Sequence, residues 1–265
     1  MLGISRSSYY SFIVRKQSKR NIENELLLMK IKAIFAESKR RYGSPRITAE
    51  LRSQGILTGK NRIARIMREN HIAVKCRHKR HYTKKVVKQN NTDLVERRFN
   101  PAIRNRIWAS DITYIRTKEG WKYLSVVMDL YSRMIVGWKV NSSQNESIII
   151  RTVEKALISR NPDSGLIFHS DRGTQFSSDR VKQILQSNGI QQSMGAKGTC
   201  YDNAVLESFF STLKKELIYR EKYQDIDQLQ KSLFEYIEIF YNRQRKHSTL
   251  GYLSPFEFES KNVIS

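Results

Sequence analysis

Hydrophobic residues in the first part of the chain recur at helical spacing. In residues 21–36 (NIENELLLMKIKAIFA) apolar side chains return every three or four positions, which predicts an amphipathic helix. A shorter periodic stretch, ITAELRSQ, leads through Gly55 to GKNRIARIMREN, where Ile63, Ile66 and Met67 fall on one face. The order helix, glycine turn, helix predicts a helix-turn-helix, in which the second helix enters a DNA groove. An ordinary helical hairpin with a solvated basic face is the alternative.

After residue 99 the pattern changes to one typical of strands. The segments RIWASDITYIRT, GWKYLSVVMDL and RMIVGWKV are rich in β-branched and aromatic residues and predict three consecutive antiparallel strands. A helix (NESIIIRTVEKALISR), a fourth strand (GLIFHSD), a helix (SSDRVKQILQSNG) and a short fifth strand (IQQSMG) follow, and then two further helices. We expect an α/β fold, a mixed five-stranded sheet with flanking helices, preceded by an all-α region.

These changes of pattern divide the chain into five expected segments. Residues 75–98 show little periodicity and many Lys and Arg residues, which indicates a basic linker that follows phosphates. The expected organisation is an N-terminal helical segment (1–35), a helix-turn-helix-like DNA-binding region (36–74), the linker (75–98), a catalytic core (99–222) and a C-terminal helical extension (223–265).

The charge of the chain indicates the class of its partner. The 265 residues include 48 Lys and Arg against 25 Asp and Glu, a net charge of +23. Residues 1–98 carry 25 basic and 7 acidic side chains, a net charge of +18, so the remainder carries only +5. Such an excess calls for a polyanion, and nucleic acid is the first candidate.

Several protein classes are excluded by the same composition. No apolar run approaches the roughly 18 to 20 residues that span a bilayer, so we expect no integral membrane protein. The N-terminus lacks the pattern of a secretory signal, and Cys76 and Cys200 are too few for a disulfide framework. A reducing cytoplasm is the expected compartment.

Three carboxylates stand where the predicted elements could bring them together. Asp111 lies within the first strand, Asp171 ends the fourth, and Glu207 lies in the first turns of the helix after the fifth. A carboxylate inside an apolar strand is costly unless a cation compensates it, and oxygen donors of this kind bind Mg²⁺ or Mn²⁺. Paired divalent ions suit attack at a phosphodiester, which predicts a nuclease or phosphoryl transferase. Taken singly, each residue could instead be a cap, a turn residue or a surface ion pair.

The segments WASDITYI, FHSDRGTQF and CYDNAVLESFFSTLKKEL resemble the catalytic core shared by retroviral integrases and bacterial insertion-sequence transposases. Thirty-five residues separate Asp171 from Glu207, which is the spacing for which this class of two aspartates and a glutamate is named. The blocks VVMDLYSRMIVGW and YNRQRKHSTLGYLSPFEF are most similar to the second-reading-frame transposases. The resemblance covers about residues 36 to 260.

This resemblance implies an RNase H-like fold and a mechanism without a covalent enzyme intermediate. Two Mg²⁺ or Mn²⁺ ions would be shared by Asp111 and Asp171, with Glu207 completing the second metal site. The implied reaction is DNA cleavage followed by strand transfer, with a water or a DNA 3′-hydroxyl as nucleophile. The implied partners are double-stranded DNA of the element ends and target, further copies of the chain in a synaptic complex, and a protein segment from an upstream reading frame. The implied location is the bacterial cytoplasm, on the nucleoid through DNA.

Basic residues in three places are candidates for DNA contact. One group lies on the second helix of the predicted helix-turn-helix, one on the helix that carries Glu207, and one near the C-terminus. The candidates are Lys60, Arg62, Arg65, Arg68, Lys214, Lys215, Arg243 and Arg245. Solvated helix faces and ends are the alternative for each group.

Other polar residues allow two interpretations each. His169 could act at the site, by contacting the scissile phosphate or steadying the metal site, or be a hydrogen-bonded structural histidine. The position of Asp129 before a turn favours a turn or ion-pair role over that of a metal ligand. Gly195 and Gly198 predict a loop that moves beside the site, or an ordinary connection. Asp202 and Asn203 precede the Glu207 helix and are expected to cap it. His71, Cys76, His78 and His81 are too irregularly spaced to favour a zinc site.

Two rival functions use the same fold. A structure-selective nuclease would cleave DNA without joining it. A DNA-binding repressor, an inhibitor or a decayed element would bind DNA without chemistry, although the intact set of three carboxylates argues against decay.

Overall fold

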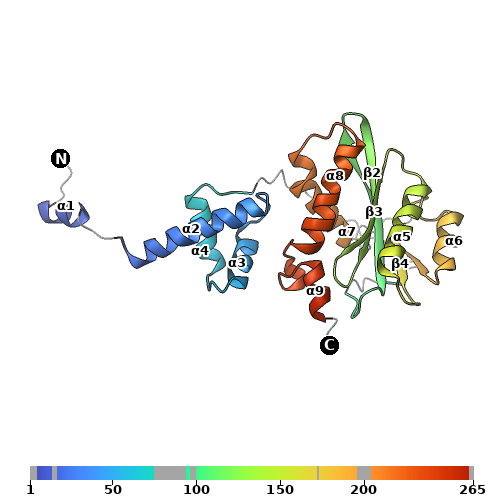
Figure 1. The fold of residues 1–265 in the computed structure, drawn as a ribbon, viewed down its shortest axis with the longest axis horizontal. Helices are drawn as coiled ribbons and strands as arrows, with labels where there is room; N and C mark the ends of the chain where they lie inside the picture. Colours follow the sequence, from blue (N-terminus) through green and yellow to red (C-terminus); the bar gives the residue numbers. More distant parts are fainter. Residues whose placement is uncertain are drawn as a thin grey trace. The chain divides into compact units, whose positions relative to one another are not determined.

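The computed structural model describes residues 5–13, 17–74, 94–95, 100–171, 173–195 and 204–262, and the chain divides into two compact units, residues 1–76 and 77–265 (Figure 1). The expected basic linker lies outside the described residues except for Leu94 and Val95. Its role therefore stays a prediction.

The first unit is helical, as the apolar periodicity predicts. It contains α1 (Arg6–Ile13), α2 (Lys19–Glu37), α3 (Ser44–Ser53) and α4 (Lys60–Glu69). The Ser18 hydroxyl accepts a hydrogen bond from the Asn21 amide and begins α2, and Gly55 adopts a φ of 80° after α3. Helix α2 packs against both α3 and α4. The apolar face shared by the three helices consists of Leu27, Ile31, Ile34, Phe35, Ile47, Leu51, Ile63, Ile66 and Met67.

The second unit contains the expected mixed five-stranded sheet. Its strands are β1 (Ile107–Thr117), β2 (Gly120–Asp129), β3 (Ile135–Asn141), β4 (Ile167–Ser170) and β5 (Gln191–Met194), in the order β3-β2-β1-β4-β5. β1, β2 and β3 pair antiparallel, whereas β4 is parallel to both β1 and β5. The first three strands are therefore consecutive and antiparallel, as predicted.

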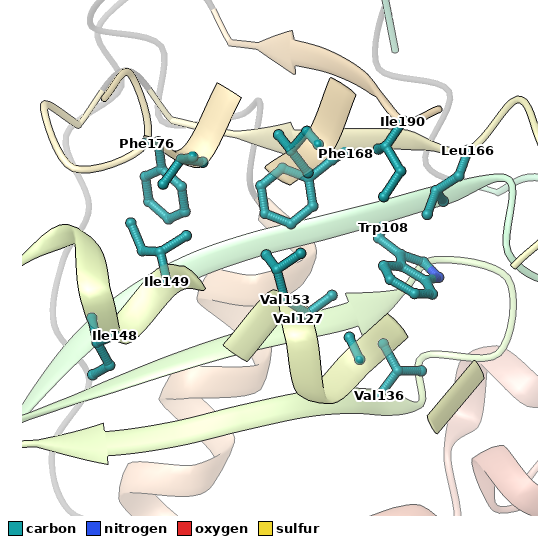
Figure 2. Packing of buried hydrophobic residues seen from close by; sticks show 13 residues of the cluster. Trp108, Val127, Val136, Ile148, Ile149, Val153, Leu166, Phe168, Phe176 and Ile190 are labelled. Carbon is teal, nitrogen blue, oxygen red and sulfur yellow. The ribbon is translucent and has the colours of Figure 1, made fainter. Parts of the chain in front are cut away.

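One face of the sheet is covered by α5 (Glu146–Arg160), beside which α6 (Asp179–Ser187) packs. The core between the sheet and these helices contains Trp108, Phe168 and Phe176, together with Ile149 and Val153 of α5 (Figure 2). Gly137 allows α5 to approach β3 closely, because a Cβ atom there would lie 2.5 Å from the carbonyl oxygen of Thr152.

The C-terminal helices lie on the other side of the sheet, as Figure 1 shows for α7 and α8. They are α7 (Ala204–Glu216), the 3₁₀ turn η2 (Ile218–Arg220), α8 (Ile226–Phe234), the π-helical segment η3 (Glu235–Tyr241), the 3₁₀ turn η4 (Ser248–Leu250) and α9 (Pro255–Asn262). The Asn242 side chain donates to the carbonyl oxygen of Ile135 at 2.9 Å and accepts from its amide at 3.0 Å. The Asn242 side chain thereby satisfies both backbone groups of Ile135 in β3, which is an edge strand of the sheet.

In the described parts of the chain, no helix has both the length and the apolar character that a membrane crossing requires.

Candidate active site

Strand pairing places two of the three predicted carboxylates beside each other. β4 is parallel to β1, and the last residue pair in their register is Ser110 with Ser170. Asp111 is the next residue of β1, and Asp171 directly follows the end of β4. Because neighbouring strands lie about 4.8 Å apart, both side chains belong to one end of the β1–β4 ladder.

Glu207 comes from a different element. It lies in the first turn of α7, and α7 packs against β1. Lys214 is two turns further along the same helix, and its Nζ atom lies 4.9 Å from the centre of the Tyr114 ring. Helical periodicity therefore puts an acid and a base on the side of α7 that borders Asp111.

The electrostatics of Asp111 connect these groups. The pKa of its carboxyl is raised from 3.8 to about 7, mainly by burial and also by the negative charges of Asp171 and Glu207, against the lowering effects of the Ile112 amide and of Lys214. The Ile112 amide donates to Asp111 Oδ1 at 2.7 Å. Burial also raises the pKa of Glu207. Asp171 and Glu207 are thus close enough to influence the charge of Asp111.

The donor set suits a hard divalent cation, although its members are not in contact distance of a shared ion. Across the described ranges, no three His, Cys, Asp or Glu side chains are gathered closely enough to hold one metal ion. All three candidates are nevertheless carboxylates, which Mg²⁺ and Mn²⁺ prefer. Asp111 is half-buried next to two further acids, and a cation would relieve this unfavourable arrangement.

His169 is a structural histidine. Its side chain is 1% exposed in β4, and its Nδ1 atom forms a hydrogen bond of 2.9 Å with the hydroxyl of Ser193 in β5. The Leu94 amide donates to the same hydroxyl at 3.0 Å. Of the two interpretations of His169, the structure supports the hydrogen-bonded one, because a buried ring cannot reach a DNA phosphate.

Asp129 is a buried ion-pair residue, which agrees with the role predicted from its position before a turn. Its Oδ2 atom lies 3.1 Å from Arg160 Nη2 and accepts from the Asn105 amide, while its Oδ1 atom accepts from the Tyr131 amide. Arg160 also pairs with Glu259 of α9 at 2.5 Å. Asp129 therefore ties the end of β2 to α5 and α9 and lies away from the three carboxylates.

Helix α4 presents the basic residues predicted for DNA contact. Lys60, Arg65 and Arg68 are exposed, whereas Arg62 is half-buried. Arg62 pairs with Glu23 of α2 at 2.9 Å, and Arg65 pairs with Glu69 one turn away at 3.4 Å. The exposed Arg65–Glu69 pair contributes little to stability, so Arg65 can exchange its partner for a phosphate, whereas the half-buried Arg62 also donates to Asn24 Oδ1 at 2.9 Å.

Three family models match the chain, and they follow its two units. An HTH-like domain matches residues 22–80, and two models of the integrase core domain match residues 101–200 and 188–255. With the observed sheet order, the integrase core model identifies the second unit as RNase H-like.

Relatives match almost the whole chain. The transposase for insertion sequence element IS904 of Lactococcus lactis is 40% identical over 94% of this chain and 99% of its own length. The chain belongs to the insertion-sequence transposases. Transposase InsF for insertion sequence IS3A of Escherichia coli is 37% identical over 99% of this chain and 93% of its own length. A 31 kDa protein of insertion element IS600 of Shigella sonnei is 37% identical over 98% and 97%.

Among solved structures, the integrase catalytic core domain of HTLV-2 in complex with magnesium covers 60% of this transposase-family chain, with 16% identity and a TM-score of 0.45.

Arg245, which was predicted to contact DNA, is buried in this member of the transposase family. Its side chain is 5% exposed, and its Nη2 and Nε atoms donate to the two carboxylate oxygens of Glu216 at 2.8 and 2.9 Å. The Tyr236 hydroxyl donates to Glu216 Oε2 at 2.8 Å. Glu216, which ends α7, anchors a buried polar cluster, and sequence spacing alone could not pair it with a residue 29 positions away.

The other predicted DNA contacts remain accessible. Arg243 is exposed, and its guanidinium lies 5.5 Å from the centre of the Phe256 ring. Lys215 is exposed on α7, and Lys214 is half-buried.

Several predicted features fall outside the described residues. They are the capping role of Asp202 and Asn203, the loop at Gly198, and Cys76, His78 and His81 of the irregular cluster. Of the glycine loop only Gly195 is described, and its amide donates to the carbonyl oxygen of Ser170.

Sequence reasoning missed an exposed aromatic pair on the β1–β2 hairpin. Tyr114 of β1 and Trp121 of β2 lie edge to face with ring centres 5.2 Å apart. Alternation within the predicted hairpin was the available signal, since Tyr114 and Arg116 occupy the same face of β1.

Proposed function

We propose that this chain cleaves DNA at insertion-sequence ends and transfers the strand, with Asp111, Asp171 and Glu207 as its catalytic carboxylates. The observation that carries this proposal is the parallel register of β1 and β4, which brings Asp111 next to Asp171 where β4 ends. Membership of the transposase family and the electrostatic effect of Asp171 and Glu207 on Asp111 support it.

The same three residues would hold two Mg²⁺ or Mn²⁺ ions. When bound, such ions stabilise the entering and leaving oxygens of an in-line displacement at phosphorus. Asp111 would release its proton when the cation binds, since its carboxyl is held partly protonated near neutral pH by burial and by its acidic neighbours. Glu207 would complete the second site from α7, and Lys214 on the same helix would hold a DNA phosphate.

DNA would be held by both units. In the first, Lys60, Arg62, Arg65 and Arg68 of α4 would contact the groove and its phosphates, as the HTH-like match and the charge of +18 in residues 1–98 support. In the second, Lys215 and Arg243 are further candidates. Arg245 does not belong to the proposed set, since it is buried in its pair with Glu216.

The full assembly would contain more than one copy of the chain, because transposition joins two element ends. We further propose that a segment encoded by an upstream reading frame takes part, and that the assembly acts in the bacterial cytoplasm on nucleoid DNA. The division into segments 1–35, 36–74, 75–98, 99–222 and 223–265 belongs to this proposal. The structure keeps residues 223–262 within the same compact unit as the sheet.

A cleavage and joining assay tests the proposal. The substrate is DNA that carries the flanks of the element, with Mg²⁺ or Mn²⁺, and the proteins are the unchanged chain and its Asp171→Asn variant, each with and without the upstream-frame segment. The matched control is Asp163→Asn, because Asp163 is an exposed carboxylate in the loop before β4. Gel-shift affinity is measured on the same DNA.

We expect metal-dependent 3′-hydroxyl ends joined to a second site with the unchanged chain and with Asp163→Asn. Asp171→Asn should lose both steps and keep its DNA affinity. Cleavage by Asp171→Asn would refute the site assignment. Cutting without joining would indicate a structure-selective nuclease, and binding without chemistry in every combination would indicate a regulatory or decayed protein.

A further inference from the structure

The hairpin of β1 and β2 extends beyond the rest of the sheet on one side. β4 pairs only with residues 107–110 of β1, whereas β2 pairs with β1 as far as residue 117. Beyond Asp111, no strand of the described chain therefore covers the other edge of β1. Cross-strand partners share a face, and here the pairs are Tyr114 with Tyr123 and Arg116 with Trp121.

Two large aromatic side chains on this face are exposed to solvent. Tyr114 is 59% exposed and Trp121 is 48% exposed, and their rings meet edge to face at 5.2 Å. Core packing does not require this arrangement, since the neighbouring Tyr123 already packs against the hydrophobic core. Exposed aromatic rings that fix each other's orientation form a preformed surface for a flat ligand.

Two cations border the rings. The guanidinium of Arg116 lies 5.2 Å from the centre of the Trp121 ring, and Lys214 Nζ lies 4.9 Å from that of Tyr114. The positive charge of Lys214 also lowers the pKa of Asp111. The same lysine therefore links the aromatic surface to the proposed catalytic carboxylates.

Lys214 places the surface near the carboxylates. Tyr114 follows Asp111 by three residues in one strand, about 10 Å at the usual rise per residue, and although alternation turns the two side chains to opposite faces of β1, Lys214 lies beside the Tyr114 ring and lowers the pKa of Asp111. Aromatic rings stack on any nucleobase, and adjacent cations hold the connecting phosphates. A second copy of the chain is a poor occupant, because each copy has a net charge of +23 and the surface is itself cationic.

We propose that Tyr114, Trp121, Arg116 and Lys214 form a stacking site for unpaired bases of the DNA strand next to the scissile phosphate. The site would hold the frayed end of the duplex open while the carboxylates act. This inference rests on the proposed function, because it assumes that a DNA strand passes Asp111.

Binding measurements without catalysis test the site. The probes are a blunt duplex, the same duplex with an unpaired thymidine tail, and the same duplex with an abasic tail that keeps the phosphates and lacks the bases. The proteins are the full chain and its Trp121→Ala, Tyr114→Ala and Trp121→Phe variants, in chelator, with affinity read by fluorescence anisotropy. Phe234→Ala is the matched control, since Phe234 is an exposed aromatic of α8 in the same unit.

We expect the unchanged chain to prefer the thymidine tail over the abasic tail by about tenfold, in line with base–aromatic stacking. Trp121→Ala and Tyr114→Ala should remove this preference, whereas Trp121→Phe and Phe234→Ala should keep it. Trp121 is the one exposed indole, since Trp108 and Trp138 are buried, so the thymidine tail should also quench tryptophan fluorescence in the unchanged chain.

The proposal would be overturned if Trp121→Ala preferred the thymidine tail over the abasic tail as strongly as the unchanged chain does. A change of oligomeric state in Trp121→Ala, with the base preference intact, would also overturn it and assign the surface to protein contact. Either result leaves the cleavage assay with Asp171→Asn untouched, so failure of the stacking site and failure of the proposed function are distinguishable.

Discussion

At the scale of single residues, the candidate site depends on one half-buried carboxyl. Asp111 is placed by β1 among groups that all disfavour its charge except Lys214 and the Ile112 amide. A residue in this position stores unfavourable energy in the metal-free protein and releases it when a cation binds. Stability should therefore report on the site independently of catalysis.

The raised pKa of Asp111 predicts a specific pH dependence. Its folded-state pKa of about 7 lies above the ordinary value of 3.8, so the folded state holds the proton more tightly and loses stability as pH rises from about 4 to 7. Asp111→Asn, which cannot ionise and can still accept from the Ile112 amide, should stabilise the metal-free protein by on the order of 2 kcal/mol at pH 8.

Urea unfolding in chelator at pH 4 and pH 8 measures this effect. At pH 4 the variant and the unchanged chain should be equally stable, and Asp163→Asn should differ from neither at both values. An equal effect of Asp111→Asn at the two pH values would show that Asp111 ionises normally in the folded protein.

At the scale of elements, side chains from distant segments hold the C-terminal helices on the core. The pair of Glu216 and Arg245 joins the end of α7 to the segment after η3, and Arg160 joins α5 to α9 through Glu259. The hydrogen bond with Glu216 and its charge raise the pKa of Arg245 despite burial. The position of α7, and therefore that of Glu207, thus depends on contacts far from the site.

Removal of one partner from this buried pair should be costly. Arg245→Met leaves the Glu216 carboxylate buried without its bidentate donor, and we expect a loss of about 3 kcal/mol in the free energy of unfolding. Arg243→Met is the matched control, because Arg243 is exposed two residues earlier, and it should change stability by less than about 0.5 kcal/mol. Urea unfolding distinguishes the two, and similar values for both would contradict the pairing.

The arginines of α4 are expected to contribute to DNA affinity. Arg62→Ala with Arg65→Ala should weaken binding and reduce the slope of log affinity against log salt by about one unit per lost phosphate contact. Arg20→Ala, an exposed arginine at the start of α2, is the control for loss of charge alone. Gel shifts over a series of salt concentrations measure the slope, and an unchanged slope in the double variant would refute a role of these arginines.

At the scale of the whole molecule, charge and number of copies decide what the protein can do. A net charge of +23 disfavours self-association without DNA and favours it on DNA, which neutralises the excess. We expect sedimentation to show a single species at moderate salt without DNA, and a complex with at least two copies when DNA carrying an element end is added. A complex of one copy and one duplex that still joins ends would contradict the proposed synaptic assembly.

The sequence by itself determined the class of elements, the family and the candidate carboxylates. Apolar periodicity is a local property, so it predicted α2, α4 and the succession of strands and helices along the chain. The spacing of Asp171 and Glu207 marked the family resemblance. Tertiary structure alone decided which charges are buried and what they meet. Arg245 has a surface-like neighbourhood in the sequence, yet the packing of α7 against the C-terminal segment encloses it with Glu216. Likewise Tyr114 and Trp121 form a site only because strand register and the early end of β4 leave one face of the hairpin in water, and such non-local pairing is not encoded in the pattern of either strand alone.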